Sequence, residues 1–220
     1  MRQVAAVILA AGEAKRFRRS PDETKLIAEL DGKPIVRHVA EAALASRAHP
    51  VLLVTGHAHE QVASALDGLM LEQIHNNDPG AGLSASLKLA VGALPSTARG
   101  AVILLGDMPR IAPSLIDRLI DAFDSAPAEP LAVVPVRGGH GGNPALLGRG
   151  LFAAVRTLQG DKGARDLIAA ARENILELPV GDSAIEIDID TREDLRRHCH
   201  DAEWGATNRP ARLVHAAVTA

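Results

Sequence analysis

The sequence of 220 residues is poor in aromatic side chains: it has three phenylalanines, one tryptophan and no tyrosine, and aromatic residues make up 2% of the chain. Hydrophobic residues nonetheless account for 47% of it. A core of this composition has to be built from alanine, valine, leucine and isoleucine. Such residues are typical of parallel strands that helices cover on both faces, so the composition favours an α/β fold.

Cysteine and net charge are also scarce. A single cysteine, Cys199, excludes an internal disulfide and fits a reducing compartment. The 24 basic and 27 acidic side chains leave a net charge of −3, which gives no general attraction to nucleic acid or to a membrane surface. No stretch approaches the ~20 apolar residues of a membrane-spanning helix. The apolar run at residues 4–11 is short for a signal peptide, and basic residues follow it. We therefore expect a cytoplasmic protein with no nucleic-acid and no membrane partner.

Short apolar runs alternate with amphipathic segments along most of the chain, which is typical of repeated β-α units. The pattern predicts a three-layer, Rossmann-like α/β fold, with a mostly parallel sheet and helices on both faces. We expect one domain over residues 1–200 and a C-terminal tail over 201–220, because periodicity is lost there. The predicted strands cover residues 4–10, 51–55, 72–75, 101–105, 131–136, 175–178 and 185–187, and the predicted helices cover 34–46, 60–66, 83–93, 113–123, 151–158, 164–171 and 191–198.

A loop of small residues, Leu9-Ala10-Ala11-Gly12, directly follows the first predicted strand. Small residues at the carboxyl end of a parallel strand let backbone N–H groups come close to a phosphate or a base. The loop matches neither the dinucleotide-binding fingerprint nor a Walker A motif. Arg16 and Lys25 add two cations that suit a triphosphate. The spacing alone leaves a solvated basic loop as an equally good interpretation.

Aspartates occur at two places where a metal ion could bind. Asp107 ends the apolar strand at 101–105, and Mg²⁺ prefers one or two carboxylates together with substrate phosphates. Asp107 could equally cap the turn before Pro109. Asp188 and Asp190 would point to the same face if they lay in a strand, and either could be a second metal ligand. Thr191 and Asp194, three residues apart, form a helix-capping pair instead.

These motifs occur in a specific order, and together they resemble the MobA/MocA-like nucleotidyltransferases, in particular the molybdenum cofactor cytidylyltransferases. The resemblance covers residues 4 to about 197. Its segments are Leu9–Gly12 with Arg16, Lys25-Leu26, Gly82–Leu87, Gly106–Pro109, Gly142–Leu146, Gly160–Arg165 and Asp188–Asp194.

The resemblance implies a fold of the nucleotide-diphospho-sugar transferase type and a role for each matching residue. It implies that the backbone of the first loop holds base and sugar, two cations hold the triphosphate, Mg²⁺ is the cofactor, and the later loops face an acceptor. The implied nucleotide-binding residues are Leu9, Ala10, Ala11, Gly12, Arg16, Lys25, Gly82, Ser84 and Asp107; the catalytic ones are Arg16, Lys25 and Asp107; the metal ligands are Asp107 and Asp188; and the acceptor-binding residues are Asn143, Pro144, Asp161 and Arg165.

The activity implied is transfer of CMP from CTP to the phosphate of molybdopterin, with release of pyrophosphate and with transient contact to a molybdoenzyme or its chaperone. Guanylyltransferases of this family carry L-A-G-G in the first loop, and the extra methyl group of Ala11 would crowd a purine, which favours CTP over GTP. Three alternatives stay open: a guanylyltransferase acting on the same acceptor, a cytidylyltransferase acting on another phosphorylated small molecule, and a non-catalytic carrier of the cofactor.

Overall fold

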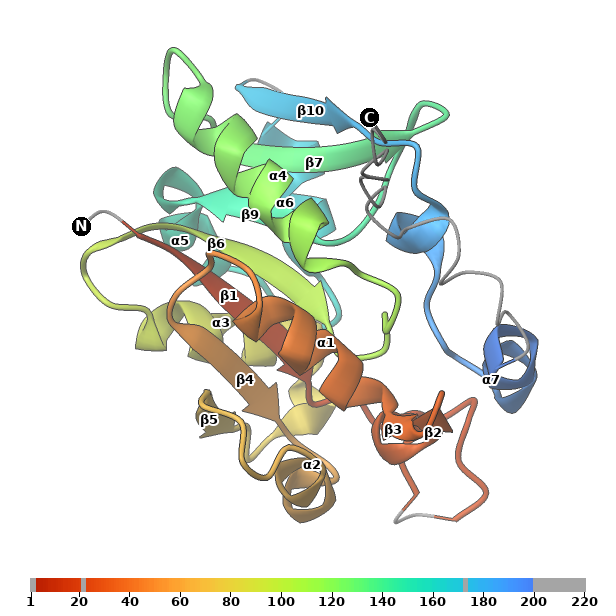
Figure 1. Cartoon of the computed structure of the whole chain (residues 1–220). Helices are drawn as coiled ribbons and strands as arrows, with labels where there is room; N and C mark the ends of the chain where they lie inside the picture. The colour runs from red at the N-terminus through yellow and green to blue at the C-terminus, as the bar shows by residue number, and fades with distance from the viewer. Residues whose placement is uncertain (1–2, 21–22, 172–173, 200–220) are drawn as a thin grey trace, which may run out of the picture.

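Figure 1 shows the computed structural model of the chain, which describes residues 3–20, 23–171 and 174–199. The expected tail at 201–220 lies outside the described residues. An eight-stranded sheet forms the centre of the molecule, with the order β10-β7-β9-β6-β1-β4-β5 and with β8 paired to β7. Its strands are β1 (Gln3–Ala10), β4 (Val51–Thr55), β5 (Glu72–His75), β6 (Ala98–Leu105), β7 (Ala132–Arg137), β8 (His140–Gly141), β9 (Ala145–Gly148) and β10 (Ile175–Pro179).

Strand β1 lies in the middle of the sheet and is buried on both faces. It pairs in parallel with β4 on one side and with β6 on the other. Because successive side chains of a strand point to opposite faces, Val4, Ala6 and Ile8 join one core and the residues between them join a second core. An apolar run without a polar face therefore forms a central strand, as predicted.

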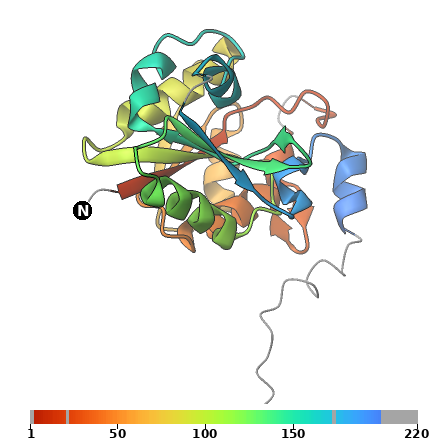
Figure 2. The same ribbon diagram turned by 90° about the horizontal axis from the view of Figure 1, so that it is seen from above.

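Helices cover both faces of this sheet, which confirms the three-layer architecture (Figures 1 and 2). The first core receives the buried side chains of α1, α2 and α4, and the second core receives those of α3, α5 and α6. A last helix, α7, lies beside the short hairpin of β2 and β3. The bounds are β2 (Glu29–Leu30), β3 (Lys33–Pro34), α1 (Ile35–Leu44), α2 (His59–Ala65), α3 (Leu83–Ala93), α4 (Pro113–Ser125), α5 (Phe152–Val155), α6 (Ala164–Ala171) and α7 (Arg192–Cys199).

Several features of the second half of the chain differ from the prediction. Strand β9 was not predicted, and it lies antiparallel between β6 and β7. Its four residues are all buried, so they carry no alternating pattern, and they are too few to stand out from a loop. The helix predicted over 151–158 is shorter: α5 follows a 3-10 turn at Arg149–Leu151 and ends at Val155.

The strand predicted at 185–187 is wrong. The segment Ser183–Glu186 forms a 3-10 helix, because the side chain of Asp182 accepts a hydrogen bond from the backbone N–H of Ala184 at 2.8 Å. Ile185 is buried against the first core, which explains the apolar residue in this segment. In consequence Asp188 and Asp190 do not extend from a strand. Within the described ranges, no helix has both the length and the apolar character needed to cross a membrane.

Candidate functional site

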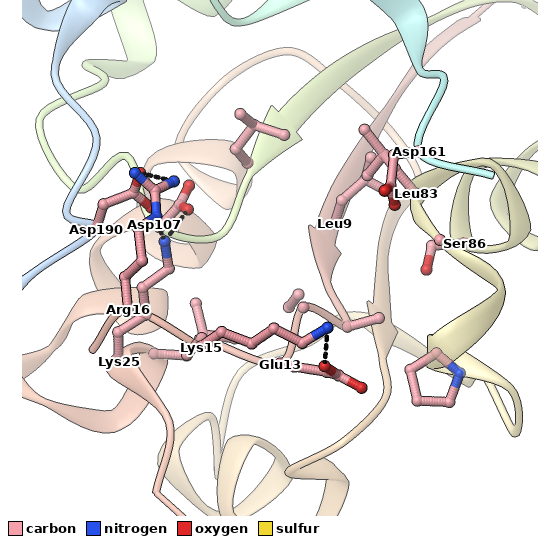
Figure 3. Close-up of a pocket in the computed structure, with 18 of the residues that line it drawn as sticks. Leu9, Glu13, Lys15, Arg16, Lys25, Leu83, Ser86, Asp107, Asp161 and Asp190 are labelled. Atoms are coloured by element: carbon pink, nitrogen blue, oxygen red, sulfur yellow. Dashed lines mark hydrogen bonds and ion pairs between the residues drawn. The ribbon is translucent and has the colours of Figure 1, made fainter. Parts of the chain in front are cut away.

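A cavity of about 500 Å³ opens at the carboxyl ends of β1 and β6 (Figure 3). Ligands of open α/β sheets bind at this edge, because the loops that follow parallel strands meet there. The residues that line it come from the first loop, the Lys25 turn, the start of α3, the end of β6 and two later loops. They are Leu9, Ala10, Ala11, Gly12, Glu13, Ala14, Lys15, Arg16, Lys25, Leu26, Pro79, Gly80, Gly82, Leu83, Ser86, Leu105, Asp107, Asp161 and Asp190.

The first loop is held against the ends of the neighbouring strands by close backbone contacts. The N–H of Gly106 donates to the carbonyl of Leu9 at 2.9 Å. A Cβ on Gly56 would lie only 2.8 Å from the Cβ of Ala11, so the loop can pack there only because residue 56 has no side chain. Ala14 then turns the chain with a positive φ of 51°. All predicted residues of this loop, Leu9 to Gly12, line the cavity.

Lys25 lies between two carboxylates at one end of the cavity (Figure 3). Its Nζ is 2.6 Å from Oδ2 of Asp107 and 2.6 Å from Oδ1 of Asp190. The other oxygen of Asp190, Oδ2, lies 2.5 Å from Nη2 of Arg16. The side chain of Lys25 is 12% exposed, whereas that of Arg16 is 73% exposed. One cation is therefore fixed inside the site, and the other reaches it from solvent.

The charges of this cluster shift the pKa of two groups. Burial alone would lower the pKa of Lys25, but the carboxylates of Asp107 and Asp190 outweigh it and raise that pKa above its ordinary value. The pKa of Asp188 is raised too, first by burial and then by the negative charges of Asp190 and Asp107. The negative charges of Asp107 and Asp190 thus act on Asp188. Lys25 pairs directly with the carboxylates of Asp107 and Asp190.

The donor set fits a divalent cation that also contacts phosphate. Oδ1 of Asp107 is buried and has no hydrogen-bond partner, which is costly unless a cation or a bound ligand satisfies it. The chain near residue 189 is fixed beside it, since the N–H of Ile189 donates to the backbone carbonyl of Asp107 at 3.0 Å. In the part of the chain that the structure describes, no group of three His, Cys, Asp or Glu side chains could hold a metal on its own. A metal here would need oxygens from the substrate.

The two candidates for the second carboxylate differ in position. Asp190 lines the cavity and binds both cations, whereas Asp188 is exposed and does not line it. The predicted role of Asp188 as a metal ligand stays a prediction, and Asp190 is the alternative that the sequence left open. Asp188 and Asp190 both neighbour the buried Ile189. The sequence could therefore distinguish them only if the direction of this loop were known.

The other end of the cavity is formed by the start of α3. Gly82 and Leu83 line it, and so does Ser86, which was not predicted. The predicted Ser84 is 2% exposed and points elsewhere, although its backbone N–H donates to the carbonyl of Gly160 at 3.0 Å. Helical spacing could have found Ser86, because residues three and four apart share a face. Its hydroxyl accepts a hydrogen bond from Nδ2 of the buried Asn76 at 3.0 Å.

The residues expected to face the acceptor do not gather in one place. Asp161 lines the cavity, but Asn143, Pro144 and Arg165 do not. The N–H of Asn143 donates to the carbonyl of Ile185 at 3.1 Å, which fixes its turn to the 3-10 helix at Ser183–Glu186. Arg165 is exposed on α6. Acceptor binding by these four residues remains a prediction.

The sheet is mostly parallel and is covered on both faces, a loop of small residues lies at its carboxyl edge, and a Lys–Asp cluster lies beside that loop. These features define an α/β protein with a cavity suited to a phosphorylated ligand. Residues 6–175 match the family model of the MobA-like NTP transferase domain, and the chain belongs to this family. The comparisons confirm the predicted fold and place the chain in a nucleotidyltransferase family.

Individual relatives agree with this class. The chain is 31% identical over 134 residues to a protein of Sorangium cellulosum named bifunctional protein GlmU; the match covers 59% of this chain and 28% of that protein. Among solved structures, Rv0371c of Mycobacterium tuberculosis in complex with manganese has a TM-score of 0.76 and 27% identity, over 90% of this chain and 99% of that one. Molybdopterin-guanine dinucleotide biosynthesis protein A of Archaeoglobus fulgidus, at 18% identity and a TM-score of 0.65, shares the fold over 93% and 100% of the two chains.

The chain spans just over a quarter of the length of the curated relatives it matches. Nucleotidyltransferases of this kind generally use a divalent metal, and the similar protein Rv0371c has been crystallised in complex with manganese.

Proposed function

We propose that this protein transfers CMP from CTP to the phosphate of molybdopterin and releases pyrophosphate, with Mg²⁺ as its cofactor. One observation carries the proposal. The side chains of Lys25, Asp107 and Asp190 form a mostly buried charge cluster at the edge of the sheet where the small-residue loop ends. A cavity with this arrangement suits a nucleotide whose phosphates meet the cluster and whose base lies toward α3.

The reaction requires little proton transfer by the protein. An oxygen of the acceptor phosphate attacks the α-phosphorus of CTP, the new P–O bond forms, and the bond to the β-phosphate breaks so that pyrophosphate leaves with its electron pair. A phosphate monoester has a second pKa near ~6, so at neutral pH it is largely dianionic and needs no general base. The main barrier is repulsion between two polyanions.

Arg16 and Lys25 address this barrier. Both cations are paired with Asp190, and an incoming triphosphate competes with that carboxylate for them. Fixed positive charge at the phosphates stabilises the charge that develops on the leaving pyrophosphate. Because Lys25 is already held inside the cavity, little reorganisation is needed when the substrate binds.

Asp107 would hold the Mg²⁺ together with Asp188, as the resemblance implies, or with Asp190, which the cavity geometry favours. The partnerless Oδ1 of Asp107 supports this assignment. When bound, the metal would act as a Lewis acid that neutralises charge on the phosphates. The remaining coordination positions would be filled by phosphate oxygens and water, as Mg²⁺ prefers.

The preference for CTP rests on Ala11. Its side chain is 6% exposed and packs against Gly56, so the methyl group would act by setting how closely the loop backbone approaches the base. A single methyl group is worth only ~1–3 kcal/mol of selectivity. We therefore expect CTP to be used at least about tenfold better than GTP.

Molybdopterin as the acceptor, and contact with a molybdoenzyme or its chaperone, rest on the sequence resemblance. The order of motifs from Leu9 to Asp194 supports it, and the turn at Asn143 and the α6 residue Arg165 remain the candidate contacts to the acceptor. Asp161, which the resemblance also assigns to the acceptor, lines the nucleotide cavity.

The test is pyrophosphate release by the full chain with Mg²⁺, Mo-molybdopterin and either CTP or GTP, with the product mass measured. We expect a cytidine dinucleotide of the cofactor. Equal rates with CTP and GTP would remove the assignment of the base. Release only with a different phosphorylated acceptor would overturn the molybdopterin assignment, and nucleotide binding without turnover on any acceptor would favour a carrier.

A further inference from the structure

The loop Gly160–Gly163 carries a carboxylate into the nucleotide cavity. Asp161 lines the cavity together with Leu83 and Ser86, at the end opposite Lys25, Asp107 and Asp190 (Figure 3). The side chains come from the loop between α5 and α6 and from the start of α3. In the sequence Asp161 lies far from α3, and the resemblance assigns it to the acceptor and not to the nucleotide.

The position of this loop is fixed by α3 itself. The carbonyl of Gly160 accepts a hydrogen bond from the N–H of Ser84, and a Cβ on Gly82 would lie 2.5 Å from backbone atoms of Gly160. The same Cβ would lie 2.7 Å from Oδ1 of Asp161, so the carboxylate can pack here only because residue 82 has no side chain. At the other end of the loop, the N–H of Gly163 donates to the side chain of Asp166 at 2.8 Å.

The charges at the two ends of the cavity set the direction of a bound nucleotide. At the Lys25 end the cations Arg16 and Lys25 offset the carboxylates of Asp107 and Asp190, and a metal ion on Asp107 would add positive charge. No ion pair of Asp161, in contrast, is recorded in the described residues, so the triphosphate belongs at the Lys25 end. The base then extends toward Asp161, beside the apolar side chains of Leu9 and Leu83. A carboxylate only accepts hydrogen bonds, so it can pair only with a donor group of the base or the ribose.

We infer that Asp161 accepts a hydrogen bond from the exocyclic amino group of cytosine and thereby selects CTP against UTP; this rests on the proposed function. Cytosine has an amino group at the position where uracil has a carbonyl oxygen. Uracil would turn this oxygen toward the carboxylate, and two acceptors facing one another leave both without a partner. A site built around a hydrogen bond to a polar group rejects an analogue that lacks it far better than an apolar pocket does.

Asp161 distinguishes bases that have an amino group from uracil. The first loop then distinguishes cytosine from guanine. Guanine also has an amino group that a carboxylate accepts from, so Asp161 and Ala11 divide the selection between them. The two residues come from different loops that line the cavity, the loop after α5 and the loop after β1. Because both act on the same bound base, a double variant measures whether their effects on nucleotide choice add.

The test is calorimetric binding of CTP and of UTP to the full chain with Mg²⁺, for the wild-type protein, Asp161→Asn and the control Lys162→Ala. Lys162 neighbours Asp161 on the same loop and does not line the cavity. We expect the wild-type protein to favour CTP by about 10–100-fold. Asp161→Asn should reduce this ratio by about tenfold or more, because an amide can donate to the oxygen of uracil. Lys162→Ala should leave the ratio unchanged.

An unchanged ratio in Asp161→Asn, with the variant folded by circular dichroism, would overturn the inference. Equal weakening of CTP and UTP would overturn it as well, since it would move Asp161 to the ribose or the phosphates. The proposed function is tested separately by turnover. A protein whose CTP preference depends on Asp161 but which forms no product with molybdopterin would contradict that function and support the role of Asp161.

Discussion

Nζ of Lys25 lies 2.6 Å from Oδ2 of Asp107, although the two residues follow different strands. Lys25 comes from the long connection after β1, and Asp107 comes directly after β6. The two strands are parallel neighbours, so their carboxyl ends deliver both side chains to one place. The pair keeps the site close to neutral before substrate arrives, and it leaves one oxygen of Asp107 without a partner.

The variant Asp107→Asn should lower the rate of nucleotidyl transfer by about 10²–10³-fold or more, because the carboxylate that would hold Mg²⁺ at the reacting phosphates is lost. Its backbone bond to Ile189 does not involve the side chain, so the fold should persist. The prediction is tested by measuring turnover as a function of Mg²⁺ concentration, with circular dichroism as the check on folding. A folded variant with an unchanged Mg²⁺-dependent rate would refute the assignment of Asp107.

The variants Asp188→Asn and Asp190→Asn should have unequal effects on activity. Asp190 holds both Lys25 and Arg16, whereas Asp188 holds neither of them through any ion pair recorded in the described residues. We expect Asp190→Asn to reduce kcat/KM by about tenfold more than Asp188→Asn does. Steady-state kinetics of the two variants, compared side by side, provide the measurement. The reverse order would restore Asp188 as the principal second carboxylate.

The stability of the protein should depend on pH through Asp188. Burial, Asp190 and Asp107 raise the pKa of Asp188, so the folded state binds this proton more tightly than the unfolded chain does. The resulting free-energy penalty appears as the pH rises through the interval between the unfolded and folded pKa values, and it persists at neutral pH.

Asp188→Asn removes this penalty, so the variant should unfold at a higher temperature than the wild-type protein at neutral pH without divalent metal. The gain should stay below ~1 kcal/mol, because the side chain is exposed and solvent screens it. Thermal unfolding should show the gain vanish at acidic pH, where Asp188 is protonated in both states. A gain that stays constant with pH would point to a cause other than charge.

Gly82→Ala should weaken nucleotide binding and destabilise the fold by about 1–3 kcal/mol. Gly82 has a positive φ of 90°, and an added Cβ would lie 2.5 Å from Gly160. The control is Gly92→Ala near the end of α3, the helix that Gly82 precedes, since a Cβ there meets nothing within 4 Å. That control should be neutral or stabilising by ~0.5–1 kcal/mol. Calorimetric nucleotide binding and thermal melts of both variants provide the comparison, and equal effects would contradict the packing argument.

Ala14→Gly should stabilise the first loop. Ala14 has a positive φ of 51°, a conformation that costs an alanine ~1 kcal/mol relative to glycine. Glycine also gains freedom in the unfolded chain, which offsets part of this gain, so we expect a change of at most ~1 kcal/mol in the favourable direction. Ala10→Gly, in the buried strand before the loop, should be destabilising instead. Denaturant unfolding of the two variants tests the contrast, and loss of stability in Ala14→Gly would be the opposite outcome.

Much of the fold could be predicted from residue patterns. The strands at Val51–Thr55 and Glu72–His75 and the helices at Leu83–Ala93 and Ala164–Ala171 begin and end where the sequence predicts. These segments have clear periodicity, which is a local property. The antiparallel strand Ala145–Gly148 escaped prediction, because a short buried strand is defined by its neighbours in the sheet and not by its own pattern.

The sequence by itself determined that Leu9–Gly12 and Asp107 lie at one edge of the sheet, because residues that follow neighbouring parallel strands come out at the same edge. The family resemblance added Lys25 to this group. Only the tertiary structure decided that Asp190 takes the charges of Lys25 and Arg16, that Ser86 lines the cavity in place of Ser84, and that Asp161 reaches the nucleotide end. Those positions depend on bonds between distant loops, such as Ile189 to Asp107 and Ser84 to Gly160, and the direction of a side chain in a loop has no local period from which it can be predicted.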